Sequence, residues 1–174
     1  MLGSRRRDLQ RSCVARIAEL DLPTPLQLPV LKQRLEEQRG REIWVLPDKG
    51  DLPPEITGLW LGASTRDYVY FREGLLGCRL ENTLLHEFAH MICKHRSASV
   101  AEQDWLRTRA PNLTAVGNIE HMCMRRDYAS SDEQEAELMA SLILARAEGR
   151  WQRLGHRSQQ DEQAAARVES IFRT

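Results

Sequence analysis

The spacing of apolar side chains divides the first half of the chain into two helices followed by three strands. Helical periodicity is clear where Leu28, Leu31 and Leu35 share one face, and Gly40 is well placed to end that helix. The strand segments are rich in β-branched and aromatic residues and are bounded by turn residues. Expected helices cover residues 4–20 and 26–39, and expected strands cover residues 41–47, 56–63 and 67–73. A short polar turn between the last two strands predicts a hairpin.

Helices dominate the pattern of the second half. The expected helices cover residues 79–95, 132–149 and 159–173, with shorter ones at 99–108 and 114–126. The first of these is strongly apolar, whereas the second begins with carboxylates and ends in apolar residues. In the N-terminal helix at 4–20 we expect Leu9, Val14, Ile17 and Leu20 to face the core.

Charge and composition narrow the class of protein. Basic and acidic residues are equal at 25 each, so no global positive field favours direct nucleic-acid binding. The runs Arg5-Arg6-Arg7 and Arg125-Arg126 are interpreted as solvated surface. No apolar run is long enough for a signal peptide or a membrane span. Four scattered cysteines without a CxxC pair indicate reduced thiols, so we expect a cytoplasmic protein that has no membrane partner.

The sequence HEFAH at positions 86–90 is the strongest chemical signal. In a helix, His86 and His90 are four residues apart and lie on one face, so both imidazoles can reach one Zn²⁺ ion. Glu87 is then placed to act as general base toward a water activated by the metal. A chain of this composition contains such a pattern by chance only about 0.01 times. The motif therefore predicts a catalytic zinc site.

A third protein ligand is needed, because catalytic zinc keeps three protein ligands and one open position. The carboxylate-rich helix at 132–149 is its expected source. Glu133 shares a face with the small residues Ala136 and Ala140, which would let this helix approach the motif helix closely. We therefore expect Glu133 to be the ligand.

Two neighbouring carboxylates receive other roles. Glu137, one turn after Glu133, could orient a histidine ligand through a hydrogen bond. Glu135 shares a face with Leu138, Met139 and Leu142, so its side is interpreted as core or a partner surface.

The two motif helices resemble those of the ImmA/IrrE metallo-endopeptidases. LLHEFAHMI at 84–92 is followed about forty residues later by the pattern E-x-E-A-x-x-x-A-x-x-L-L, which here begins at Glu133. The resemblance covers roughly residues 26–148 and is specific in the two helices only. The chain departs from the family at Glu137, where Asn or Asp is usual, and near Arg146, where the family has a proline.

This resemblance implies a zincin-like α/β (α+β) fold, with a small, partly antiparallel sheet packed on the HExxH helix and flanking helices. It implies that zinc is bound by His86, His90 and Glu133, and that Glu87 is the base. It also implies a protein substrate such as a helix-turn-helix transcriptional repressor, and some members are toxin components. The expected organisation is an N-terminal helix and connector at 1–25, a metallopeptidase domain at 26–149 and a C-terminal amphipathic helix at 150–174.

Other residues and functions stay open. Tyr128, or instead His121, could stabilise the developing oxyanion during hydrolysis. A second zinc site of Cys93, His95, His121 and Cys123 is a weaker hypothesis, because the spacing within each pair suits neither a zinc knuckle nor one helix face. Two alternative functions are a non-catalytic, zinc-containing partner of a DNA-binding protein and a hydrolase of small molecules. The intact Glu87 argues against the first, since a structural zinc needs no base.

Overall fold

The computed structural model describes residues 2–54, 56–95, 104, 107–108, 119–124, 131–147 and 157–172. Its elements, in chain order, are α1 (Leu2–Glu19), α2 (Leu28–Arg39), β1 (Glu42–Asp48), β2 (Gly58–Ala63), β3 (Arg66–Arg72), α3 (Gly77–Cys93), β4 (Ile119–Met124), α6 (Ser131–Ala147) and α7 (Arg157–Phe172). These helices and the mixed sheet place the protein in the α+β class, as the apolar pattern predicted. None of the described helices has the length and apolar character needed to cross a membrane.

The four strands form one sheet with the order β1-β3-β2-β4. β2 and β3 pair in antiparallel fashion, which confirms the predicted hairpin, while β1 lies parallel to β3. The helix expected at 114–126 is wrong, because residues 119–124 form β4 and pair antiparallel to β2. Local preference over this short segment is weak, so the hydrogen-bonding edge of β2 determines its conformation. The helix expected at 99–108 lies mostly outside the described residues.

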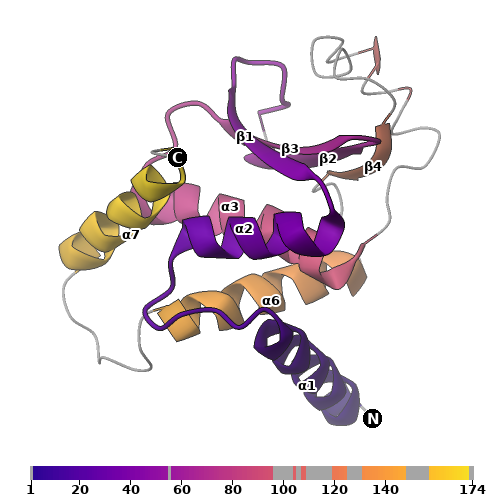
Figure 1. The fold of residues 1–174 in the computed structure, drawn as a ribbon, viewed down its shortest axis with the longest axis vertical. Coiled ribbons are helices and arrows are strands. Elements are labelled where there is room, and N and C mark those ends of the chain that lie inside the picture. Colours follow the sequence, from indigo (N-terminus) through magenta and orange to yellow (C-terminus); the bar gives the residue numbers. More distant parts are fainter. Residues whose placement is uncertain are drawn as a thin grey trace.

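Helix α3 is the centre of the fold. The sheet lies on one side of α3 and α2, and α6 packs against α3 on the other side (Figure 1). Apolar side chains therefore surround α3, and its residues from Thr83 to Cys93 are all buried. This burial agrees with the strongly apolar sequence of the helix, and it places the motif histidines in the interior.

Helix α1 presents the expected face to the core with one exception, Val14. Ile17 and Leu20 are buried as predicted, but Val14 is 51% exposed and Cys13 is fully buried in its place. Cys13 and Ile17 are separated by four residues and share a helix face, whereas Val14 is rotated by about 100° from Cys13. The buried stripe therefore begins at Cys13, and α1 packs along α6.

Two buried carboxylates connect the elements around α3. Asp67 of β3 is fully buried and accepts hydrogen bonds from Arg39, Arg41 and Trp60 Nε1. Glu81 of α3 is 1% exposed and is paired with Arg167 of α7. Buried charges of this kind are tolerated only when they are paired and hydrogen-bonded. They therefore fix where α2 and α7 lie relative to the sheet and α3.

Candidate metal centre

The C-terminal half of α3 brings the two motif histidines together. His86 and His90 are 5% and 2% exposed, and their Nε2 atoms are 3.0 Å apart. The helical i, i+4 spacing puts both rings on one face, as the sequence predicted. Their ring centroids are 4.7 Å apart and nearly perpendicular, so both Nε2 lone pairs can converge on one point.

Glu133 approaches the same point from α6. Its Oε2 lies 3.2 Å from His86 Nε2, and its Oε1 lies 3.3 Å from His90 Nε2. Close packing of the two helices makes this short reach geometrically accessible, and Ala136, one turn along α6, is fully buried. The structure thus brings together the three residues singled out as ligands, although their binding of zinc stays a prediction.

The spacing of these donors fits a first-row metal ion. Zinc bonds to His nitrogen and carboxylate oxygen are 2.0–2.2 Å long, so a tetrahedral ligand set has ligand-to-ligand separations of about 3.3 Å. The two Nε2 atoms are 3.0 Å apart, and they lie 3.2 Å and 3.3 Å from the Oε2 and Oε1 atoms of Glu133, respectively. His86, His90 and Glu133 therefore form one of the two groups among the described residues that could hold a metal ion.

The protonation states also suit metal binding, which requires a neutral imidazole and an ionised carboxylate. Burial lowers the pKa of His90 below its usual value, despite the opposing influence of Glu133. Burial of Glu133 disfavours its charged form, but hydrogen bonds to His86 and His90 outweigh that cost and lower its pKa to about 2. At neutral pH His90 is therefore neutral and Glu133 is charged.

Glu87, the predicted base, is buried at 3% exposure between α3 and the start of β2. Gly58, the first residue of β2, faces this side chain. A methyl group placed on Gly58 would lie 2.6 Å from Thr83 Cγ2 and 2.7 Å from Glu87 Oε1. Both distances are below van der Waals contact, so the absence of a side chain at Gly58 allows the strand to lie against Glu87.

A second buried group lies directly behind His90. Cys93, His95 and Glu135 each offer a donor atom within 4.8 Å of the others. His95 Nδ1 is 2.9 Å from His90 Nδ1, and its Nε2 is 3.2 Å from Glu135 Oε2. The interpretation of the Glu135 face as core is confirmed, since Met139 on the same face is fully buried, and α6 also directs the Glu135 carboxylate at a buried imidazole. The side chains of His121 and Cys123, expected to join Cys93 and His95, lie outside the described residues.

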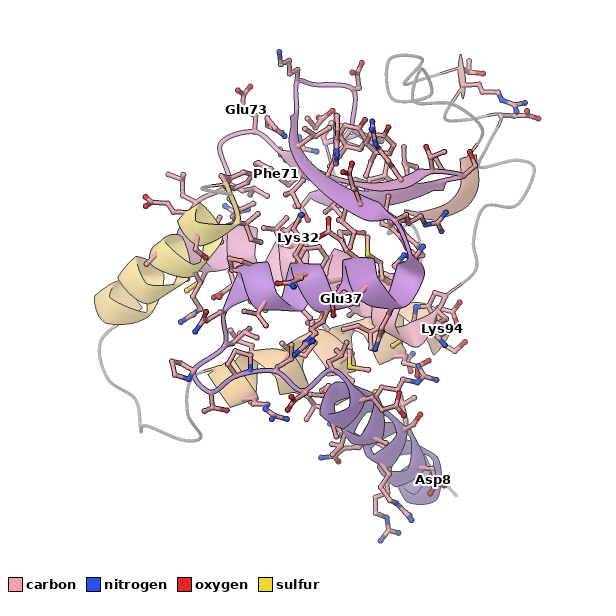
Figure 2. All side chains as sticks on the ribbon, in the orientation of Figure 1. Asp8, Lys32, Glu37, Phe71, Glu73 and Lys94 are labelled. Atoms are coloured by element: carbon pink, nitrogen blue, oxygen red, sulfur yellow. The ribbon has the colours of Figure 1, made fainter. Side chains whose placement is uncertain are left out.

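The end of α3 explains how His95 returns to His90. Lys94 follows the last helical residue in the left-handed conformation at φ 56°, at the end of α3 (Figure 2). The His95 backbone N–H donates to the His90 carbonyl at 3.0 Å, and the Lys94 N–H donates to Met91 at 3.1 Å. This is the Schellman pattern of helix termination, which reverses the chain over the final turn. Sequence spacing alone did not indicate it, because Lys94 occupies a position where glycine is usual.

Two other predicted residues have different outcomes. Glu137 Oε2 lies 3.6 Å from His86 Nδ1, on the side expected of an orienting acceptor, but its side chain is 63% exposed and the distance exceeds a hydrogen bond. Tyr128, the predicted oxyanion partner, lies outside the described residues.

Comparison with known proteins supplies no relative, because no family model, curated protein or solved structure matches the chain.

Proposed function

We propose that this protein is a zinc-dependent endopeptidase with a zincin-like fold, similar to the ImmA/IrrE family. One observation carries the proposal: the buried Nε2 atoms of His86 and His90 are 3.0 Å apart, and each lies 3.2–3.3 Å from one carboxylate oxygen of Glu133. Their separations fit the bond lengths of zinc, and two histidines with one glutamate are a ligand set of catalytic zinc peptidases. Glu87, adjacent to His86 in the chain, supplies the carboxylate that a purely structural metal site does not need.

Each residue then has a definite part in peptide hydrolysis. A zinc ion held there would supply a Lewis acid, which would polarise the scissile carbonyl and lower the pKa of a water molecule to about 7. Glu87 accepts a proton from the attacking water and returns a proton to the departing amine, the role of a general base and then acid. His86, His90 and Glu133 hold the metal, and the proposed role of Tyr128 is to donate a hydrogen bond to the oxyanion.

A protein substrate, such as a helix-turn-helix repressor, is the proposed target. β4 is an edge strand of the described sheet, and its residue Met124 pairs with Leu59. Leu59 follows Gly58, the residue that lies against Glu87. A terminal strand offers backbone N–H and C=O groups to an extended peptide, which supports an endopeptidase over a hydrolase of small molecules. The repressor as substrate is supported by the family resemblance alone.

Zinc content and the variant Glu87→Gln test the proposal together. The purified protein should contain about one zinc per chain by elemental analysis, and Glu87→Gln should retain it. Both proteins are then incubated with a peptide library made from a digested bacterial proteome, and new termini are identified by mass spectrometry. We expect cleavage by the wild type and a loss of about 10²–10⁴-fold in Glu87→Gln, since that is what a general base contributes.

Three other outcomes would each contradict a different part of the proposal. A folded chain that neither retains nor takes up zinc would contradict the metal site itself. Equal cleavage by wild type and Glu87→Gln would remove Glu87 from the mechanism. In the third outcome zinc is bound but neither peptide nor repressor is cleaved. If, in addition, His86→Ala abolishes the cellular response that depends on this protein while Glu87→Gln preserves it, the protein is a zinc-containing interaction module.

A further inference from the structure

A continuous line of contacts runs from the proposed metal site to helix α1. His90 Nδ1 lies 2.9 Å from His95 Nδ1, and His95 Nε2 lies 3.2 Å from Glu135 Oε2. The other carboxylate oxygen, Oε1, accepts a hydrogen bond of 3.0 Å from Arg16 Nη1. His90 and His95 are 2% and 7% exposed, so these contacts are shielded from water.

Only one arrangement of protons makes every contact a hydrogen bond while His90 can bind a metal. A metal on His90 Nε2 requires the proton of this ring to be on Nδ1, where it can donate to His95 Nδ1. The His95 proton must then be on Nε2, where it donates to the Glu135 carboxylate. Arg16 donates to the second oxygen of Glu135, so this series of hydrogen bonds ends on a fixed positive charge.

The same residues do not form a convincing second metal site. Arg16 already supplies a cation to Glu135, and its Nη1 also donates to the Cys93 carbonyl at 3.4 Å. A divalent ion between Cys93, His95 and Glu135 would lie close to this guanidinium and be repelled by it. Burial, and then the charge of Glu135, raises the pKa of the Cys93 thiol to about 12, so forming the thiolate that a metal ion requires costs more than it does for an ordinary thiol.

We propose that His95 and Glu135, held by Arg16, are positioning residues that fix the tautomer and ring orientation of His90. Hydrogen bonds to the outer nitrogen of a metal-binding histidine pre-orient the ring and increase its basicity, and their loss typically lowers metal affinity 10- to 100-fold. The inference rests on zinc binding at the proposed site and is independent of whether the protein hydrolyses peptides.

The test measures zinc affinity by competition with a chromogenic chelator. His95→Phe keeps a ring in the buried position but cannot accept the His90 proton, so the dissociation constant for zinc should rise about 10- to 100-fold. His95→Asn restores an acceptor near the position of Nδ1, so its affinity should lie between those of His95→Phe and wild type. Cys93→Ser is the matched control in the same buried group and should bind zinc as wild type does.

A parallel measurement separates positioning from folding. Urea unfolding of the metal-free variants reports stability, and a residue with only a structural role would change this stability while leaving the zinc affinity unchanged. Glu135→Gln provides a second variant should His95→Phe fail to fold. The amide keeps the shape but not the charge, so it should weaken zinc binding by several-fold.

The outcomes are decisive for the inference. A zinc affinity equal to that of the wild type in His95→Phe overturns it. If His95→Phe does not fold, wild-type zinc affinity in both His95→Asn and Glu135→Gln overturns it instead. Two zinc ions per wild-type chain, one of which is lost in Cys93→Ser, overturns it in favour of a second metal site. Weakened zinc binding in His95→Phe, in a protein that cleaves no peptide, supports the inference while contradicting the proposed endopeptidase activity.

Discussion

The substitution Gly58→Ala tests how Glu87, the proposed general base, is held. An alanine methyl group at this position would be 2.6 Å from Thr83 Cγ2, 2.7 Å from Glu87 Oε1 and 3.2 Å from Glu87 Cγ. The distance to Glu87 Oε1 is roughly 0.7 Å shorter than an ordinary contact of 3.4 Å, and the distance to Thr83 Cγ2 is shorter still. Strand β2 is fixed by pairing with β3 on one side and β4 on the other, so the Glu87 side chain must move.

Two magnitudes follow from this displacement. Overpacking by one methyl group costs about 1–3 kcal/mol, which is less than the 5–15 kcal/mol by which proteins of this kind are stable. The Gly58→Ala protein should therefore fold. A catalytic group displaced by about 1 Å loses on the order of 10²-fold in rate. We expect peptide hydrolysis to fall about 10- to 100-fold, while zinc content stays at the wild-type value because the three atoms nearest to the added methyl group belong to Thr83 and Glu87 and to none of the proposed ligands.

The assay compares Gly58→Ala with a glycine variant of similar cost elsewhere. Gly40 follows the last residue of α2 at φ +67°, and a methyl group there would meet nothing within 4 Å. Gly40→Ala should therefore lose about 1–2 kcal/mol through backbone strain alone. Urea unfolding, zinc content and the rate of cleavage of one library-derived peptide are measured for both variants and the wild type.

The reasoning would be refuted by a wild-type cleavage rate in folded, zinc-loaded Gly58→Ala. An equal loss of rate in Gly40→Ala would also contradict it, since a general loss of stability would then explain the effect.

Three further predictions concern the metal site and the buried charges. Glu133→Ala should raise the dissociation constant for zinc by orders of magnitude in a chelator competition, whereas Glu137→Ala should change it by at most about tenfold, because Glu137 is largely exposed and 3.6 Å from His86; similar effects would show that Glu133 is not a ligand. Asp67→Ala should lower the free energy of unfolding in urea by about 3–5 kcal/mol, since Arg39, Arg41 and Trp60 would lose their buried hydrogen-bond acceptor. A loss below 1 kcal/mol would contradict this. Removal of zinc with EDTA should lower the melting temperature reversibly, by an amount corresponding to about 4 kcal/mol at a zinc concentration 1,000-fold above the dissociation constant; an unchanged melting temperature would show that the folded state does not bind zinc.

Much of the site could be predicted from local sequence, because each of its two helices carries its own pattern of apolar, small and metal-binding side chains. The apolar surface of α3 predicted a buried helix, and the spacing of His86 and His90 predicted their convergence. Small residues beside Glu133 predicted the face of α6 that lies against α3. These inferences depend only on the 3.6-residue period of a helix and on the size of neighbouring side chains. Bound zinc and peptide hydrolysis stay predictions.

Tertiary structure decided the features that join distant segments. The segment at 119–124 is a strand because the edge of β2 offers it hydrogen bonds, and its own sequence did not indicate this. His95 lies forty residues before Glu135, and Arg16 lies 119 residues before it. No periodicity links such positions, since their contact requires α1, α3 and α6 to pack together and the chain to reverse at Lys94. Helical spacing thus predicted which donors can share the proposed metal site, whereas the packing of three helices determined which groups lie behind His90.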